Sequence, residues 1–145
     1  MQKVQSIKKS LSQKTRYTFD DLLQIMELLT SPEGCPWDKE QTHESIAKNA
    51  LEEAQELQEA IESGKAENIK KEAGDVLLQA VFHGDIGRRN GTFTTHDIVD
   101  SLCKKLVSRH THVFGEDKAE TAEDSLKFWN RAKEKEIKPQ IQKNQ

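Results

Sequence analysis

Two groups of acidic residues in this sequence have the spacing of a site for a divalent cation. The segment LEEAQE carries Glu52, Glu53 and Glu56, and the segment EAGD carries Glu72 and Asp75. Residues three apart project from the same face of a helix, so each segment presents two neighbouring carboxylates. Carboxylate oxygens are ligands that Mg²⁺ prefers, and the ion keeps waters that phosphate oxygens can replace. The residue types therefore favour metal-dependent phosphate chemistry.

The elements that carry these acids are predicted to be two helices joined by a tight turn. Apolar residues recur at helical spacing over residues 42–63 and again over residues 66–89, and Gly64 ends the first run. Helices joined by so short a loop pack antiparallel. One acid pair lies about ten residues before the turn and the other about ten residues after it, so the four carboxylates are expected at one height of the hairpin.

Carboxylates gathered at one level repel each other, and a bound dication would remove that penalty. Gly74 costs a helix about 1 kcal/mol relative to alanine, so it suggests a close approach at this point. A solvated acidic face without metal remains an alternative. A di-iron centre needs Glu-x-x-His on two helices, and Glu40 with His43 is the one such motif, placed before the helix. His110 and His112 have no third ligand nearby in the sequence, which argues against zinc.

The composition predicts an all-α protein, a bundle of about five helices. The 145 residues are 34% hydrophobic and 32% charged, which is typical of amphipathic helices. Three prolines and seven glycines are too few for a sandwich of many short strands. Capping boxes are expected where Thr18, Thr94 and Thr121 each precede an aspartate by three residues. The predicted helices cover residues 19–30, 42–63, 66–89, 96–110 and 122–137, with loops between them.

The distribution of charge and the terminal sequences exclude several classes of partner. Residues 20–130 carry 23 acidic and 12 basic side chains, a net charge of −11, which argues against nucleic acid and favours bound cations. The N-terminus lacks the apolar core of a secretory signal, and no segment has the length of a membrane span. Cys35 and Cys103 show no CxxC spacing, so we expect reduced thiols in a cytoplasmic protein.

Five segments, taken in order, closely resemble the MazG-like nucleotide pyrophosphohydrolases of the all-α NTP pyrophosphatase superfamily. They are GCPWDKEQTHES, LEEAQELQEAIE, EAGDVLLQAVFH, KLVSRHTHVFG and FWNRAKEKE. The likeness implies a MazG-like domain over residues 19–138, preceded by a basic, frayed or weakly helical arm at 1–18 and followed by a polar tail at 139–145. Ser108 departs from the family pattern at a position where arginine is common, which puts part of the phosphate binding in doubt.

The resemblance also implies roles for particular residues. Mg²⁺, with Mn²⁺ as an alternative ion, would be held by Glu53, Glu56, Glu72 and Asp75. Glu52 would assist from outside the ligand set, and a water bridged to Glu53 would provide the general-base route. Lys105 and Arg109 would bind the triphosphate and stabilise its developing charge, and Trp129 and Lys133 match an aromatic and basic pair that contacts the substrate. Solvated surface positions for the basic residues, and core packing for Trp129, are the alternatives.

The activity that this resemblance implies is hydrolysis of an NTP or dNTP to nucleoside monophosphate and pyrophosphate. Either general turnover or the clearance of non-standard nucleotides could be its purpose. The alternative function is a catalytically idle nucleotide-sensing or partner-binding helical dimer.

A homodimer or higher homo-oligomer is expected because the first predicted helix has a wide leucine-rich surface. That surface exceeds the stripe of roughly 100° that one packing face requires. It consists of Leu22, Leu23, Met26, Leu28 and Leu29.

Overall fold

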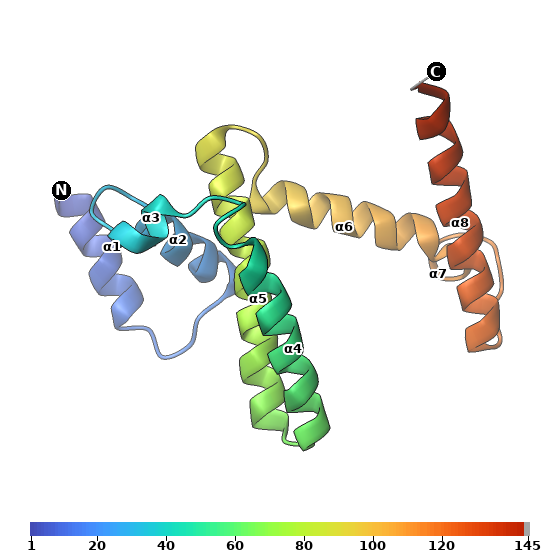
Figure 1. The fold of residues 1–145 in the computed structure, drawn as a ribbon, viewed down its shortest axis with the longest axis horizontal. Coiled ribbons are helices and arrows are strands. Elements are labelled where there is room, and N and C mark those ends of the chain that lie inside the picture. Colours follow the sequence, from blue (N-terminus) through green and yellow to red (C-terminus); the bar gives the residue numbers. More distant parts are fainter. Residues whose placement is uncertain (144–145) are drawn as a thin grey trace. The chain divides into compact units, whose positions relative to one another are not determined.

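A computed structural model describes the backbone of residues 1–143 and the side chains of residues 1–136. Over that range the chain contains eight helices and no strand, which confirms the predicted all-α class (Figure 1). The chain forms two compact units, Met1–His96 and Asp97–Gln145, which are considered separately. Among the described residues there is no helix with the length and apolar character needed to span a membrane.

The first unit contains five helices and the second is built mainly from three. In the first unit these are α1 (Gln2–Ser12), α2 (Phe19–Leu29), α3 (Pro36–Glu40), α4 (Ala47–Ser63) and α5 (Ala66–Asn90). The remaining helices are α6 (Thr95–Arg109), α7 (Thr111–Phe114) and α8 (Ala122–Lys143).

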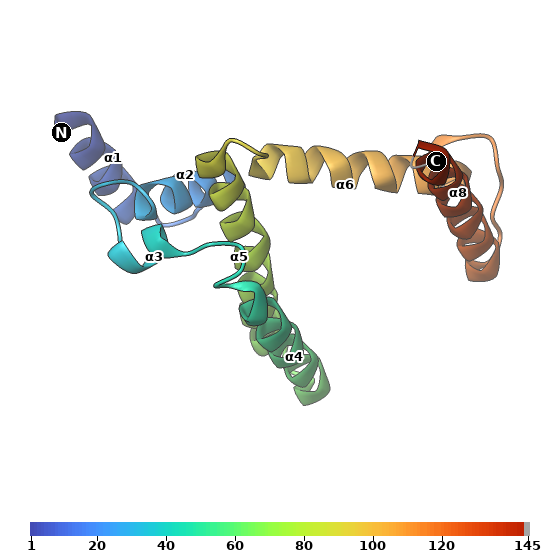
Figure 2. The ribbon, with the colours of Figure 1, turned by 45° about the horizontal axis from the view of Figure 1, so that its top comes forward.

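Helices α4 and α5 form the predicted antiparallel hairpin and lie side by side in both views (Figures 1 and 2). Gly64 ends α4 with φ 70°, a left-handed conformation that glycine adopts without steric cost. Its N–H donates to the carbonyl oxygen of Ile61 at 3.1 Å, and α5 begins two residues later. The turn therefore leaves little freedom in how the two helices are aligned.

The core of the first unit is small and lies against the second half of α5. Met26 of α2 and Ile46, which precedes α4, pack on three apolar side chains of α5. Leu22 and Leu23 cover the edge of this cluster. The core members from α5 are Val81, Phe82 and Ile86. One acid pair lies on α4 and the other lies in the first half of α5, and both are outside this apolar cluster.

The second predicted helix starts later than expected. Thr42 was expected to cap it, but α4 begins at Ala47. Thr42 instead closes a turn with Ser45, in which each side-chain oxygen accepts the other residue's backbone N–H, at 3.1 and 2.8 Å. The same capping chemistry thus stabilises a turn, and this turn delivers Ile46 to the core with only 1% of its surface exposed.

Of the two alternatives expected for the N-terminal arm, frayed or weakly helical, the structure has the helical one, because residues 2–12 form the regular helix α1. Leu11 is buried, and its carbonyl oxygen accepts the Tyr17 hydroxyl at 2.7 Å. Lys14 pairs with Asp21 at 2.6 Å, and this aspartate also completes the predicted capping box at the start of α2. Leu28 and Leu29 of α2 line a cavity together with Leu11 of α1, so part of the leucine-rich surface of α2 faces α1 within the same chain.

Two short helices and a longer C-terminal helix also differ from the sequence expectation. Residues 36–40 and 111–114 lie in predicted loops but form α3 and α7. Pro36 starts α3 at a position where proline costs no hydrogen bond. Helix α8 continues to Lys143, beyond the predicted end at 137, and its predicted capping box between Thr121 and Asp124 is present.

Apolar side chains remain exposed on the hairpin and throughout the second unit. On α4 and α5 they include Leu51, at 76% exposure, together with Ile61 and Leu77. From residue 97 to residue 136, no side chain is buried, although α6 carries Val99, Leu102 and Leu106. Contiguous exposed apolar surface usually marks an interface, and two-fold pairing of identical chains is its commonest form.

We therefore expect the protein to be at least a dimer in solution. Sedimentation equilibrium at micromolar concentration should give twice the 16.6 kDa of one chain, or a larger multiple. Leu51→Glu, which places a charge on the exposed face of α4, should shift the equilibrium towards the monomer. Gln55→Glu adds the same charge one helical turn further along the same exposed face of α4 and should shift the equilibrium in the same direction. A wild-type mass of one chain would contradict the expectation.

Candidate metal centre

The predicted acid pairs converge on one point of the hairpin. Glu53, Glu56, Glu72 and Asp75 each offer one carboxylate oxygen, and these four oxygens lie within 4.8 Å of one another. The first two project from α4 and the last two from α5, as the spacing of three residues requires. Glu56 is exposed, whereas the other three are half-buried. The sequence prediction of a shared height is confirmed for all four side chains.

The gathered negative charge is unfavourable in the protein alone. Burial, followed by the charge of Glu56, raises the pKa of Glu53. Burial also raises the pKa of Glu72, with the carboxyls of Asp75 and Glu56 adding to the effect. Lys71 offsets this only weakly, because its ammonium lies 4.0 Å from Glu72. The ionised carboxylates therefore lack an adequate positive partner within the described part of the chain.

The donor set fits a hard divalent cation. Two buried oxygens, Oε2 of Glu53 and Oε2 of Glu72, have no hydrogen-bond partner. Buried acceptors without a partner are costly, and a cation would satisfy both of them. All four groups are carboxylates, which suits Mg²⁺ or Mn²⁺ rather than a metal that prefers sulfur or imidazole. Because each helix supplies only two carboxylates, a bound cation would keep coordination positions for waters and for substrate oxygens.

The structure also tests what the sequence suggested for Glu52 and Gly74. Glu52 is exposed and lies outside the group of four, in keeping with its expected place outside the ligand set, and its assisting role stays a prediction. The proposed close approach at Gly74 is wrong within this chain, because a Cβ at that position would meet no atom within 4 Å. The glycine is an exposed helix position, and no contact in this chain explains it.

A cavity of about 260 Å³ adjoins the acidic group on the side of Glu53. The short helix α3 forms one wall with Trp37 and Asp38, and the Trp37 ring packs edge-on against Phe82 with centroids 6.4 Å apart. Asn49 and Gln79 add amide groups to the lining. The walls of this cavity come from four separated segments, namely α2, α3, α4 with the residue before it, and α5, and no spacing rule in the sequence connects them.

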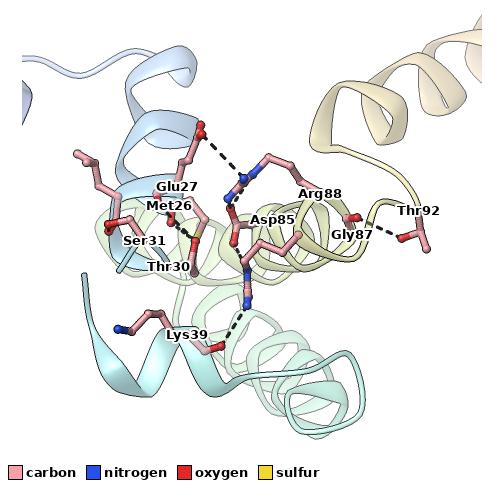
Figure 3. Close-up of polar contacts among 11 residues, drawn as sticks. Met26, Glu27, Thr30, Ser31, Lys39, Asp85, Gly87, Arg88 and Thr92 are labelled. Carbon is pink, nitrogen blue, oxygen red and sulfur yellow. Dashed lines mark hydrogen bonds and ion pairs between the residues drawn. The ribbon is translucent and has the colours of Figure 1, made fainter. Parts of the chain in front are cut away.

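A buried ion-pair network lies at the far end of α5, next to the core (Figure 3). Asp85 is only 6% exposed, and each of its carboxylate oxygens accepts a hydrogen bond from an arginine side chain. Arg88 donates to Oδ1 at 2.9 Å, and Arg89 donates to Oδ2 at 3.0 Å. Arg88 also approaches Glu27 of α2 at 3.9 Å, while Arg89 donates to the carbonyl oxygen of Lys39 in α3 at 3.0 Å.

The predicted substrate residues on α6 and α8 belong to the second unit. Lys105 and Lys133 are exposed. Arg109 lies over the Trp129 ring, with its guanidinium carbon 4.9 Å from the ring centroid, so these two residues are brought together.

Arg109 already has an anionic partner that the sequence did not predict. Its Nη2 donates to Glu136 at 2.9 Å, and this hydrogen bond lowers the pKa of the Glu136 carboxyl. The hydroxyl of Ser108 also donates to Glu136, at 3.2 Å. The Nε of Arg109 is buried without a partner and is available to a further acceptor. A phosphate that binds Arg109 would therefore use this free donor or displace the carboxylate.

The sequence matches the family model described as the MazG nucleotide pyrophosphohydrolase domain over residues 41–114, about half of the chain. This match includes all four carboxylates. The chain belongs to the MazG family.

Curated relatives and a solved structure agree with this membership. The chain is 52% identical over 98 residues to the nucleoside triphosphate pyrophosphohydrolase/pyrophosphatase MazG of Thermotoga maritima. The matched residues make up 68% of this chain and 38% of that protein. The chain is 42% identical over 118 residues to the nucleoside triphosphate pyrophosphohydrolase of Escherichia coli strain K12, covering 81% and 45%. The chain therefore spans less than half the length of these relatives. A crystal structure of a mazG-related protein from Thermotoga maritima is similar, with a TM-score of 0.65 and 25% identity over 79% of this chain and 98% of that one.

The repulsion within the acidic group makes a prediction about stability. Without divalent metal, Glu72→Gln should raise the unfolding temperature, because it removes one of four mutually repelling charges. Added Mg²⁺ should raise the unfolding temperature of the wild type, since a ligand that binds the folded state stabilises it. The variant should respond much less to Mg²⁺. Differential scanning calorimetry with and without the ion measures both effects.

Glu59→Gln provides the matched control, since Glu59 is an exposed acid on α4 outside the group of four. It should leave the response to Mg²⁺ unchanged. An undiminished response in Glu72→Gln would show that the ion binds elsewhere.

Proposed function

We propose that this chain is a metal-dependent nucleoside triphosphate pyrophosphohydrolase that converts an NTP or dNTP to the monophosphate and pyrophosphate. The observation that carries the proposal is the convergence of four carboxylate oxygens within 4.8 Å, in a chain of the MazG family. The names of the relatives supply the reaction class, and the acidic group supplies a site suited to it. The biological purpose, including the clearance of non-standard nucleotides, follows from which base the protein prefers.

Each carboxylate would act as a ligand of Mg²⁺, or of Mn²⁺ in its place. Such an ion binds phosphate oxygens and lowers the pKa of a coordinated water. Glu53 has a second role open to it, because its Oε2 lacks a hydrogen-bond partner and the residue also lines the cavity. We assign this oxygen to orient the attacking water. The other three carboxylates would hold the ion from both helices, Glu56 from α4 and Glu72 and Asp75 from α5.

The basic residues of the second unit would neutralise the phosphate chain. Arg109 offers a planar group with a free Nε, and Lys105 lies one helical turn earlier on the same face of α6. Lys133 of α8 is a further exposed cation. Trp129 would hold the Arg109 guanidinium in place through the stacking contact. Positive groups aimed at the leaving pyrophosphate stabilise the charge that grows on it.

The cavity beside Glu53 would receive the nucleoside. Its position suits a substrate whose α-phosphate lies at the acidic group, because the sugar and base then extend from that point. Trp37 and Phe82 provide apolar surface, and Asn49 and Gln79 provide amide donors and acceptors that can distinguish bases. The volume of about 260 Å³ limits the site to one nucleoside.

A binding module without turnover is the second candidate. The ion pair between Arg109 and Glu136 favours it, since this contact occupies a residue that catalysis would require. A protein that binds NTP and metal without releasing pyrophosphate would support this function.

The products and the position of isotopic label test the proposed reaction. With Mg²⁺ and a mixture of NTPs, phosphorus NMR should show monophosphate and pyrophosphate. In ¹⁸O water the label should appear in the monophosphate, because attack is expected at the α-phosphorus. Glu53→Ala and Asp75→Ala should each reduce turnover by at least about 100-fold while the protein remains helical.

Label in the pyrophosphate would instead place the attack at the β-phosphorus. Diphosphate and orthophosphate as products would refute the pyrophosphohydrolase proposal. Near-normal turnover in both alanine variants would refute the assignment of the ligands.

The basic group is tested separately by Lys105→Ala and Arg109→Ala. Each should raise the KM for NTP by roughly tenfold, because a charge-assisted contact with phosphate is lost. Affinity for Mg²⁺ in the absence of nucleotide should stay the same. Lys104→Ala is the matched control, since Lys104 is exposed on the same helix and paired with Asp100 at 2.7 Å. Unchanged kinetics in a double Lys105 and Arg109 variant would make both residues ordinary surface positions.

A further inference from the structure

Arg89 joins two parts of the first unit that are 50 residues apart in sequence. Its Nε donates to Oδ2 of Asp85 at 3.0 Å, and its Nη1 donates to the carbonyl oxygen of Lys39 at 3.0 Å. Lys39 lies in the last turn of α3, where backbone carbonyls have no partner within the helix. The arginine therefore connects a buried carboxylate on α5 to the end of α3.

The neighbouring Arg88 makes a natural comparison. It binds the other oxygen of Asp85 at 2.9 Å and approaches Glu27 of α2 at 3.9 Å. The contacts of Arg88 thus connect α5 to α2, whereas those of Arg89 connect α5 to α3. Both arginines stabilise the same buried carboxylate, so they differ mainly in the second partner.

Helix α3 is tethered at its start, where the Cys35 N–H donates to the carbonyl oxygen of Leu29 at 2.7 Å, and Lys39 donates to the carbonyl oxygen of Pro32 at 3.2 Å, but neither contact reaches α5. Helix α3 has only five residues, too few to be stable by itself. Its contacts with α5 are the hydrogen bond from Arg89 and the edge-on packing of Trp37 against Phe82. Trp37 is still 57% exposed, so this packing buries less than half of its surface. Loss of the hydrogen bond would free α3 to move relative to α5.

We propose that Arg89 is a positioning residue for substrate binding: it holds α3 so that Trp37 and Asp38 form the wall of the cavity next to Glu53. The inference rests on the proposed function, because it assigns the nucleoside to that cavity. Arg89 acts through α3 and does not itself line the cavity. It determines how the nucleoside is bound, while the acidic group and the phosphate chain are independent of it.

The geometry explains why an arginine serves here. The guanidinium offers several N–H donors in a rigid plane, so it can bind a carboxylate with Nε and a carbonyl with Nη1 at the same time. A lysine places all its donors on one atom and cannot reach both acceptors in this arrangement. Arg89→Lys therefore keeps the charge beside Asp85 and removes the link to α3.

The first measurement uses no nucleotide. In a Trp129→Phe background, Trp37 is the remaining tryptophan, and quenching of its fluorescence by acrylamide reports how well α3 holds it. Arg89→Lys should raise the quenching constant about twofold, because a freed α3 exposes the ring. Arg88→Lys should leave it unchanged. Circular dichroism and the unfolding temperature show whether each variant is folded.

The second measurement uses the chain with Trp129 intact. Arg89→Lys should raise the KM for NTP on the order of tenfold, as expected when a substrate contact is misplaced, with kcat changed less than about threefold. Inhibition by inorganic pyrophosphate, which lacks a nucleoside, should not change. Trp37→Ala should also raise KM, and the double variant should be no worse than Trp37→Ala alone, because both act through the same wall.

Four results would overturn the inference in a protein that turns over NTP. These are unchanged quenching in Arg89→Lys, an unchanged KM, equal effects from Arg88→Lys, and additive effects of Arg89→Lys with Trp37→Ala. If Arg89→Lys does not fold, Trp37→Ala must still raise KM without altering inhibition by pyrophosphate, and failure to do so overturns the role of the wall. Failure of the proposed function is distinct, since the wild type would then release no pyrophosphate.

Discussion

Mutual repulsion among four carboxylates is the constraint around which the first unit is organised. The hairpin of α4 and α5 brings Glu53, Glu56, Glu72 and Asp75 to one place, and two of their buried oxygens have no partner there. An arrangement of this kind costs stability unless something positive occupies it. The tight turn at Gly64 and the packing of α5 against α2 hold the helices together despite that cost. The protein thus keeps an unfavourable charge cluster whose natural complement is a divalent cation and the phosphates it attracts.

The other features of the chain follow from what such a site needs. Charge gathered on a hairpin can bind a cation, but it cannot choose a nucleotide. The cavity next to Glu53 offers the missing selectivity, and its wall depends on a five-residue helix that Asp85 and Arg89 hold against α5. In the proposed function the second unit would contribute basic residues, of which Arg109 is already in contact with Trp129 and Glu136. Metal binding, nucleoside binding and phosphate binding would then depend on different segments, so that variants can separate them.

Local rules in the sequence predicted the features that depend on helical periodicity. The spacing of three between acids, the glycine between two apolar runs and the reciprocal Thr and Asp caps each depend on residues within one turn of a helix. The hairpin, the acid group and two capping boxes were found in this way. The regularity of the helix at residues 2–12 was underestimated, because contacts of the loop that follows it hold it in place: Tyr17 donates to the carbonyl oxygen of Leu11, and Lys14 pairs with Asp21 of α2. Periodicity contains no information about such partners.

The remaining differences have the same physical origin. Thr42 has a capping pattern, yet the pattern closes a turn, because Ile46 must enter the core before the helix can start. The contacts of Arg89 with Lys39 and of Arg109 with Glu136 join residues 50 and 27 positions apart. A single sequence contains no signal that would predict either contact. Gly74 illustrates the opposite error, since a rule about helix propensity suggested a contact where this chain has open space.

The location of a bound ion tests the central claim most directly. Crystals of the protein grown with Mn²⁺ would give an anomalous signal at the metal. The account predicts a strong peak between α4 and α5, with Glu53, Glu56, Glu72 and Asp75 as its protein ligands. A peak at other residues, with these four carboxylates turned towards solvent, would contradict it.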